Sequence, residues 1–252
     1  MRYDTRYRSR SALFNWSFPN GVKWLLIANV AIFLVDFFGS FVSGDEIFGP
    51  FKLVPNQVIH GAVWQLFTYL FLHSLASPGH ILFNMLGLWM FGAPIEQTWG
   101  TRRFLQYYFL CGVGAGICVV AAALAFGGAS QPTIGASGAI YGLLLAFGML
   151  FPEQEILVMF LFPIKAKYMV MIFGAIAFVF SFQRGSTISN LAHLGGMIFG
   201  FVYIKMQFSW HGKAGVSFDF RQRWKEYKLQ RARKKFKVYL KKHGSGDGPW
   251  VN

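Results

Sequence analysis

The chain has 252 residues, of which 54% are hydrophobic and only 13% are charged, and its formal net charge is +14 at pH 7. Charged residues are about half as frequent as in an average soluble domain, which excludes a disordered chain and an ordinary cytosolic protein. The 29 Phe, 28 Gly and 8 Trp are typical of proteins with membrane helices and interfacial tryptophans. We therefore interpret the chain as an integral, multi-pass membrane protein.

Six apolar segments approach the roughly 20 residues that a membrane-spanning helix needs. They predict an all-α membrane protein in which residues 22–208 form a six-transmembrane-helix bundle. Residues 1–21 are then a basic amino-terminal segment without a removable signal peptide, and residues 209–252 are a basic tail. In chain order, the six predicted helices are residues 22–42, 80–98, 104–126, 137–151, 167–182 and 188–208.

The positions of the basic residues predict how these helices are oriented. If the helices alternate in direction, 22 of the 24 lysines and arginines fall on the side of the two termini, and only Lys52 and Arg184 fall on the other. Positive residues collect on the cytoplasmic side of a membrane. We therefore expect both termini to be cytoplasmic.

The connection between the first two helices, residues 43–79, lies on the outer side in this topology and is rich in aromatic residues. A connection of this length without structure of its own is unusual unless it has a function. We expect it to lie partly in the membrane interface, where aromatic side chains accumulate.

The fourth helix is too short to cross the bilayer. Residues 137–150 cover about 21 Å, against a hydrocarbon core of about 30 Å, and Pro152 and Glu153 fix the cytoplasmic end. The helix therefore begins at Ser137, roughly 10 Å below the outer surface. Residues 127–136 must then enter the membrane as non-helical backbone, which is permitted only where protein or a water-filled cavity surrounds it.

Polar side chains inside membrane helices are costly, so each is a candidate for function. Near the outward ends of the second, fourth and sixth helices lie His80, Asn84, Ser137 and His193. His80 and Asn84 share one helix face at the spacing i, i+4, and Ser137 and Tyr141 repeat that spacing. Glycines around Ser137 and after His193 allow the fourth and sixth helices to approach closely.

This convergence predicts a Ser–His dyad. An imidazole within hydrogen-bond reach of a serine hydroxyl can take its proton and make it a nucleophile. Ser137 would then be the nucleophile and His193 the base. His80, Asn84 and the Ser137 N–H would donate hydrogen bonds to a developing oxyanion. Taken singly, these residues are as well explained by packing or proton relay, and a proton-coupled transporter with a broken helix also fits them.

Four segments of the chain resemble the rhomboid family of intramembrane serine proteases, in the family's order and on the expected helices. They are residues 64–73 (WQLFTYLFLH), 80–85 (HILFNM), 135–142 (GASGAIYG) and 192–196 (AHLGG). The resemblance implies that Ser137 and His193 are catalytic and that His80 and Asn84 belong to the oxyanion hole. It further implies that Tyr141 packs on the catalytic imidazole and orients it, and that Glu96 is structural.

The resemblance implies an intramembrane serine endopeptidase that cleaves membrane-anchored proteins near the outer face of the membrane, with no metal or organic cofactor. Its partners would be transmembrane protein substrates and the lipid bilayer. The alternative is a non-proteolytic rhomboid-like protein that binds membrane clients. The compact six-helix form implies a prokaryotic plasma membrane. One departure from the family is the interval from His73 to His80, which is longer and includes Ser77, Pro78 and Gly79.

The carboxy-terminal residues 218–242 mix Lys and Arg with aromatic residues. On the cytoplasmic face, we expect this stretch to attract anionic lipid, at about 1 kcal/mol for each basic residue near the surface. Binding of nucleic acid or of a cytosolic partner is the alternative. The stretch contains no base-specific motif, and we expect no nucleic acid.

Overall fold

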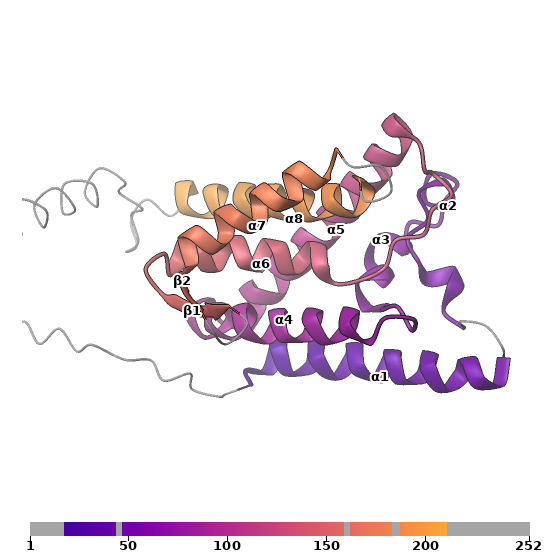
Figure 1. The fold of residues 1–252 in the computed structure, drawn as a ribbon, viewed down its shortest axis with the longest axis horizontal. Coiled ribbons are helices and arrows are strands. Elements are labelled where there is room, and N and C mark those ends of the chain that lie inside the picture. The colour runs from indigo at the N-terminus through magenta and orange to yellow at the C-terminus, as the bar shows by residue number, and fades with distance from the viewer. Residues whose placement is uncertain (1–17, 44–46, 159–161, 183–186, 211–252) are drawn as a thin grey trace, which may run out of the picture. The chain divides into compact units, whose positions relative to one another are not determined.

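The computed structural model describes residues 18–43, 47–158, 162–182 and 187–210 (Figure 1). Most of the predicted tail and most of the predicted amino-terminal segment lie outside these residues. The chain divides into two compact units, and the first of them ends at Lys205. In chain order the elements are α1 (Asn20–Ser43), η1 (Gly49–Phe51), α2 (Pro55–Ile59), α3 (Gln65–Thr68), η2 (Tyr69–Phe71), α4 (Pro78–Trp99), α5 (Thr101–Phe126), α6 (Ser137–Leu150), β1 (Glu155–Val158), β2 (Phe162–Lys165), α7 (Ala166–Phe180) and α8 (Thr187–Trp210).

Each of the six predicted apolar segments is a helix, namely α1, α4, α5, α6, α7 and α8, and no end differs by more than three residues from the predicted one. Among the described residues, two helices are long and apolar enough to cross a membrane, Asn20–Val42 and Thr101–Phe126. The helices α6 and α7 are apolar but shorter. The six helices are thereby confirmed, whereas six crossings of the bilayer are a proposal.

A short antiparallel hairpin departs from the all-helical fold that the sequence predicts. β1 and β2 pair so that Glu155 lies opposite Lys165 and Val158 lies opposite Phe162. The hairpin connects the end of α6 to the start of α7. Its sequence shows no period of two, because Ile156 and Leu157 are both apolar although the first is buried and the second is exposed, and the strand has only four residues. A run this short cannot be distinguished from a helix end by its pattern.

The helix α6 lies at the centre of the bundle, in contact with α4, α5 and α7. Figure 1 shows it between α4 and α7. Glycines bring α6 close to α8 as well: a Cβ on Gly196 would overlap the carbonyl oxygen of Gly138, and one on Gly142 would lie 3.2 Å from the carbonyl oxygen of Gly196. The helix that begins with Ser137 is therefore fixed on several sides, and its approach to α8 is the one that the glycine spacing predicts.

The outer connection is folded onto the non-helical segment that precedes α6. Both segments lie at the end of the bundle where α4, α6 and α8 begin (Figure 1). The backbone hydrogen bonds between them, donor first, are Leu53 to Thr133 (3.0 Å), Thr133 to Leu53 (2.8 Å), Asn56 to Ala129 (2.8 Å) and Gly135 to Tyr69 (2.9 Å). Protein therefore satisfies non-helical backbone ahead of Ser137, as a location inside the membrane requires.

Glu96 joins the far end of α4 to the start of α1. Its buried carboxylate accepts hydrogen bonds from the N–H groups of Gly21 and Val22, both at 2.8 Å, and from the Thr101 hydroxyl at 2.6 Å. The first N–H groups of a helix have no acceptor within that helix, so Glu96 supplies one for α1. These contacts are structural, which agrees with the role expected for Glu96.

Candidate active site

Ser137 and His193, which are 56 positions apart in the chain, meet at one hydrogen bond. The Nε2 atom of His193 lies 2.9 Å from the Oγ atom of Ser137. Ser137 is the first residue of α6, and His193 lies in the early part of α8. With its proton on Nδ1, the neutral imidazole can accept the hydroxyl proton at Nε2. This is the arrangement of a serine nucleophile and its base.

Tyr141 holds the ring of His193. The two rings are stacked, with centroids 4.1 Å apart and planes inclined by 4°. The Nδ1 atom of His193 is buried and has no hydrogen-bond partner among the described residues. Within the described part of the chain, the imidazole therefore packs against an aromatic face, and no carboxylate bonds to its Nδ1 atom.

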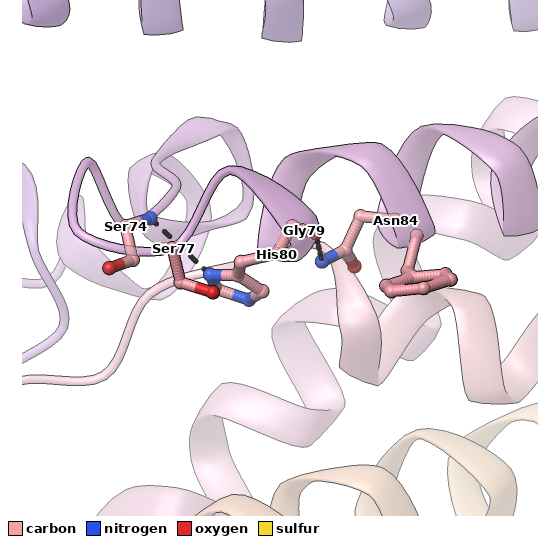
Figure 2. A pocket seen from close by; sticks show the side chains of 6 residues that line it. Ser74, Ser77, Gly79, His80 and Asn84 are labelled. Carbon is pink, nitrogen blue, oxygen red and sulfur yellow. Dashed lines mark hydrogen bonds between the residues drawn. The ribbon is translucent and has the colours of Figure 1, made fainter.

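His80 and Asn84 lie one turn apart near the start of α4, and Figure 2 shows their side chains on the same side of that helix. The Ser74 N–H donates to Nδ1 of His80 at 3.3 Å. The neutral ring must then carry its proton on Nε2, which becomes a donor. Asn84 donates from Nδ2 to the His80 carbonyl oxygen at 2.7 Å, and its amide has a second N–H. Both residues thus have a donor to offer.

Gly135 lies between the His80 donor and Ser137. Its φ of +117° is a conformation that favours glycine, and a Cβ at this position would lie 2.7 Å from Nε2 of His80. The donor atom of His80 therefore faces the turn that leads into Ser137, two residues later. The first N–H groups of α6 also lack acceptors within the helix and carry its positive end.

A pocket of about 450 Å³ opens at the start of α4 (Figure 2). Ser137 and His193 are not among the residues that line it, so the pocket borders the donor side of the site. The lining residues are Ser74, Ser77, Gly79, His80, Phe83 and Asn84.

Sequence reasoning assigned no role to Gln65, which is 1% exposed. Its Oε1 atom accepts the Val54 N–H at 2.9 Å, and its Nε2 atom donates to the Pro50 carbonyl oxygen at 3.1 Å and to the Gln57 side chain at 2.6 Å. Gln65 therefore organises the outer connection that holds the segment ahead of Ser137. The only signal in the sequence is a single amide within an otherwise apolar and aromatic run.

Comparison with known proteins relates the chain to one family. A family model described as a Rhomboid domain matches residues 60–210. The rhomboid protease GluP of Bacillus subtilis is 32% identical over 202 residues, covering 80% of this chain and 37% of that protein. The mitochondrial rhomboid protein 1 of Saccharomyces cerevisiae is 32% identical over 130 residues, covering 49% of this chain and 36% of that protein.

A shorter relative is matched over a larger share of its length. The putative rhomboid protease YdcA of Bacillus subtilis is 32% identical over 147 residues, covering 58% of this chain and 67% of that protein. The chain thus spans a little over a third of GluP and of the yeast protein, and two thirds of YdcA.

Proposed function

The chain belongs to the rhomboid family and is an integral membrane protein, and on this premise we propose that it is an intramembrane serine endopeptidase. Its substrates would be membrane-anchored proteins, cleaved near the outer face of the membrane. The observation that carries the proposal is the 2.9 Å hydrogen bond between Ser137 and His193. Relatives named as proteases support it.

The chemistry proposed for this pair is hydrolysis through an acyl-enzyme. The Ser137 Oγ attacks the carbonyl carbon of the scissile peptide while Nε2 of His193 takes the hydroxyl proton. His193 then gives this proton to the leaving amine as the C–N bond breaks. A water molecule attacks the resulting ester, His193 takes its proton, and the Ser137 hydroxyl is restored.

The negative charge that forms on the carbonyl oxygen needs donors already in place. We assign this role to Nε2 of His80, to the second N–H of Asn84 and to the Ser137 backbone N–H. The bond from Ser74 to His80 supports the assignment of His80, because it leaves the ring proton on Nε2. In this account Tyr141 keeps the imidazole of His193 facing Ser137.

The proposed topology has six crossings of the bilayer, made by α1, α4, α5, α6, α7 and α8. The 14-residue α6 is the shortened helix. The non-helical residues 127–136 cross the remaining part of the bilayer on the outer side. The distribution of basic residues supports cytoplasmic termini. The compact six-helix form is the ground on which we assign the protein to the plasma membrane of a prokaryote. The β1–β2 hairpin then lies at the cytoplasmic end of the bundle, and water reaches Ser137 from the opposite face.

Two other functions receive less support. A proton-coupled transporter would need a free acidic group inside the membrane, but Asp36 is 5% exposed and accepts the Ile47 N–H at 3.0 Å, as expected of a group that holds the chain in place. A non-proteolytic protein that binds membrane clients would have no use for a hydroxyl bonded to an imidazole at 2.9 Å.

The test is cleavage of a transmembrane reporter protein by the purified chain in lipid vesicles. Ser137→Ala and His193→Ala should each abolish cleavage while the protein stays folded by circular dichroism. Ser40→Ala is a matched control and should cleave normally, because within the described part of the chain the Ser40 hydroxyl donates to the Phe37 carbonyl oxygen of its own helix. Undiminished cleavage by Ser137→Ala would refute the proposal.

A further inference from the structure

Tyr69 is a buried residue of the outer connection that has no role in the mechanism above. It is the first residue of η2 and is 1% exposed. Its hydroxyl donates to the Gly112 carbonyl oxygen of α5 at 2.7 Å. Its own carbonyl oxygen accepts the Gly135 N–H at 2.9 Å. One residue therefore joins α5 to the turn that leads into Ser137.

The two polar ends of Tyr69 contact residues on both sides of Ser137 in the sequence. The carbonyl oxygen bonds to Gly135, two residues before the serine. The hydroxyl lies near Gly138, the residue after the serine, since a Cβ on Gly138 would lie 3.7 Å from the hydroxyl oxygen. These two contacts limit the movement of the short segment that carries the proposed nucleophile and its N–H.

The bond to Gly135 is the one nearest to Ser137 among the backbone bonds that the outer connection makes to residues 127–136. The others reach Thr133 and Ala129. Gly135 also faces Nε2 of His80. A displacement of its backbone would therefore move the entry into α6 relative to the proposed oxyanion donors, which must lie about 2.7–3.1 Å from the oxyanion.

The ring of Tyr69 occupies space that glycines leave open on α5. A Cβ on Gly116 would lie 3.2 Å from the Cε1 atom of Tyr69, and the hydroxyl bonds to Gly112, one helical turn earlier. The hydrogen bond has a direction, whereas the packing does not, so the bond fixes how far the ring extends along α5. A phenylalanine in this position would keep the packing and lose that bond.

We propose that Tyr69 is a positioning residue for Ser137: its hydroxyl, anchored on α5, fixes the carbonyl group that holds Gly135 and so sets where the Ser137 N–H and Oγ lie. The proposal rests on the proposed protease function. It assigns to the Tyr69 hydroxyl an effect on the rate of acylation and none on the binding of the substrate.

The test compares Tyr69→Phe with Tyr107→Phe, and it reads kcat and KM on a transmembrane reporter well below both unfolding temperatures. Tyr107 is the matched control, because its hydroxyl is also buried and donates to a glycine carbonyl oxygen, that of Gly142, at 2.7 Å. Each variant should unfold about 2–4 °C lower through the loss of one buried hydrogen bond. Only Tyr69→Phe should lower kcat, by about three- to tenfold with KM unchanged, because it displaces the nucleophile.

A second readout is the rate at which a fluorophosphonate labels Ser137. The reagent needs the activated hydroxyl and the oxyanion donors but not the binding of a transmembrane substrate. The labelling rate should fall in Tyr69→Phe by about the same factor as kcat and stay unchanged in Tyr107→Phe. A hydroxyl that serves stability alone would lower the unfolding temperature and leave both rates intact.

Equal losses of kcat in the two variants, or an unchanged kcat in Tyr69→Phe, would overturn the proposal. A rise in KM with kcat intact, or a fall in kcat without a fall in the labelling rate, would overturn it as well. If Tyr69→Phe does not fold, the hydroxyl serves stability and the proposal is wrong.

Failure of the protease function has a separate signature, because Ser137→Ala would then still cleave the reporter. A cleavage-dead Ser137→Ala together with a normal kcat in Tyr69→Phe would refute only the role of Tyr69.

Discussion

The rings of Tyr141 and His193 lie parallel, with centroids 4.1 Å apart and planes inclined by 4°. The two residues come from different helices, α6 and α8, and Tyr141 follows Ser137 by one helical turn. One helix therefore supplies both the proposed nucleophile and the surface against which its base is held. In the proposed mechanism, this contact orients the imidazole, a task that a carboxylate performs in a Ser–His–Asp triad.

The stacked contact predicts a difference between two substitutions of Tyr141. Tyr141→Phe keeps the ring and should retain kcat within about threefold, because stacking depends on the aromatic face. Tyr141→Ala frees the imidazole to rotate and should lower kcat by about tenfold or more, since misplaced catalytic groups are costly. Cleavage of a transmembrane reporter measures both. Equal losses in the two variants would show that the hydroxyl, and not the ring, is what matters.

Gly135 and Gly127 form a matched pair for testing the link between the turn and His80. Both have positive φ, +117° and +88°, but a Cβ on Gly127 meets nothing within 4 Å whereas one on Gly135 meets Nε2 of His80. Each change to Ala should cost about 1–3 kcal/mol of stability through backbone strain. Only Gly135→Ala should also lower kcat, by up to about 10²–10³-fold. Thermal unfolding measures the loss of stability, and reporter cleavage measures the loss of kcat. An equal loss of kcat in both variants would contradict an effect of Gly135→Ala through His80.

The stability of the outer connection should depend on the side-chain hydrogen bonds of Gln65. Gln65→Leu leaves the partly buried Val54 N–H without its acceptor, at about 1–3 kcal/mol for a buried group left unpaired. It also removes one of the two donors to the Pro50 carbonyl oxygen, which still accepts the Trp64 indole N–H. We expect a lower unfolding temperature and faster proteolysis of residues 47–72. Gln57→Leu, which removes a single bond to Gln65, is the milder control. An unchanged Gln65→Leu protein would mean that the backbone bonds to residues 127–136 alone hold this region.

The stability of the β1–β2 hairpin should fall at acid pH, because Glu153 bonds to Lys165 and Lys167 beside it. Hydrogen bonds from Lys165 and Lys167 hold the pKa of Glu153 below its usual range. A lowered pKa in the folded state stabilises the fold above the pKa of the unfolded chain, and this contribution is lost as the pH falls through the folded value. It amounts to at most about 1 kcal/mol, because the carboxylate is largely exposed. Amide exchange in β1 and β2, corrected for intrinsic rates, should be steady from pH 7 to about 5 and faster below about 4. Glu153→Gln should abolish that change, and a pH dependence that survives in this variant would contradict the assignment.

The sequence predicted the long elements well because each depends on a simple pattern. An apolar stretch of about 20 residues predicts a helix, and the glycines around Ser137 and after His193 predicted a close approach that Gly138 and Gly196 make. The start of α6 at Ser137 was predicted from a short apolar stretch whose cytoplasmic end Pro152 and Glu153 fix. The boundaries of the six helices were accordingly found from the chain alone.

Other features depend on partners distant in the chain, which no local pattern shows. The bridge from Leu53 to Thr133 joins two loops, and the bonds of Gln65 are made across an irregular connection. The hairpin was missed because its strands have four residues each. His73 lay within a recognised segment, but only the structure shows that its ring is buried without a partner in the described part of the chain and touches His80.

The most direct test of the central claim is covalent labelling of Ser137. A fluorophosphonate reacts with a serine whose hydroxyl is activated by a neighbouring base, and mass spectrometry identifies the residue that carries the label. We predict a single modification at Ser137 in the folded protein, together with loss of labelling in His193→Ala. Labelling at another serine, or labelling of Ser137 at the same rate in His193→Ala, would contradict the proposed dyad.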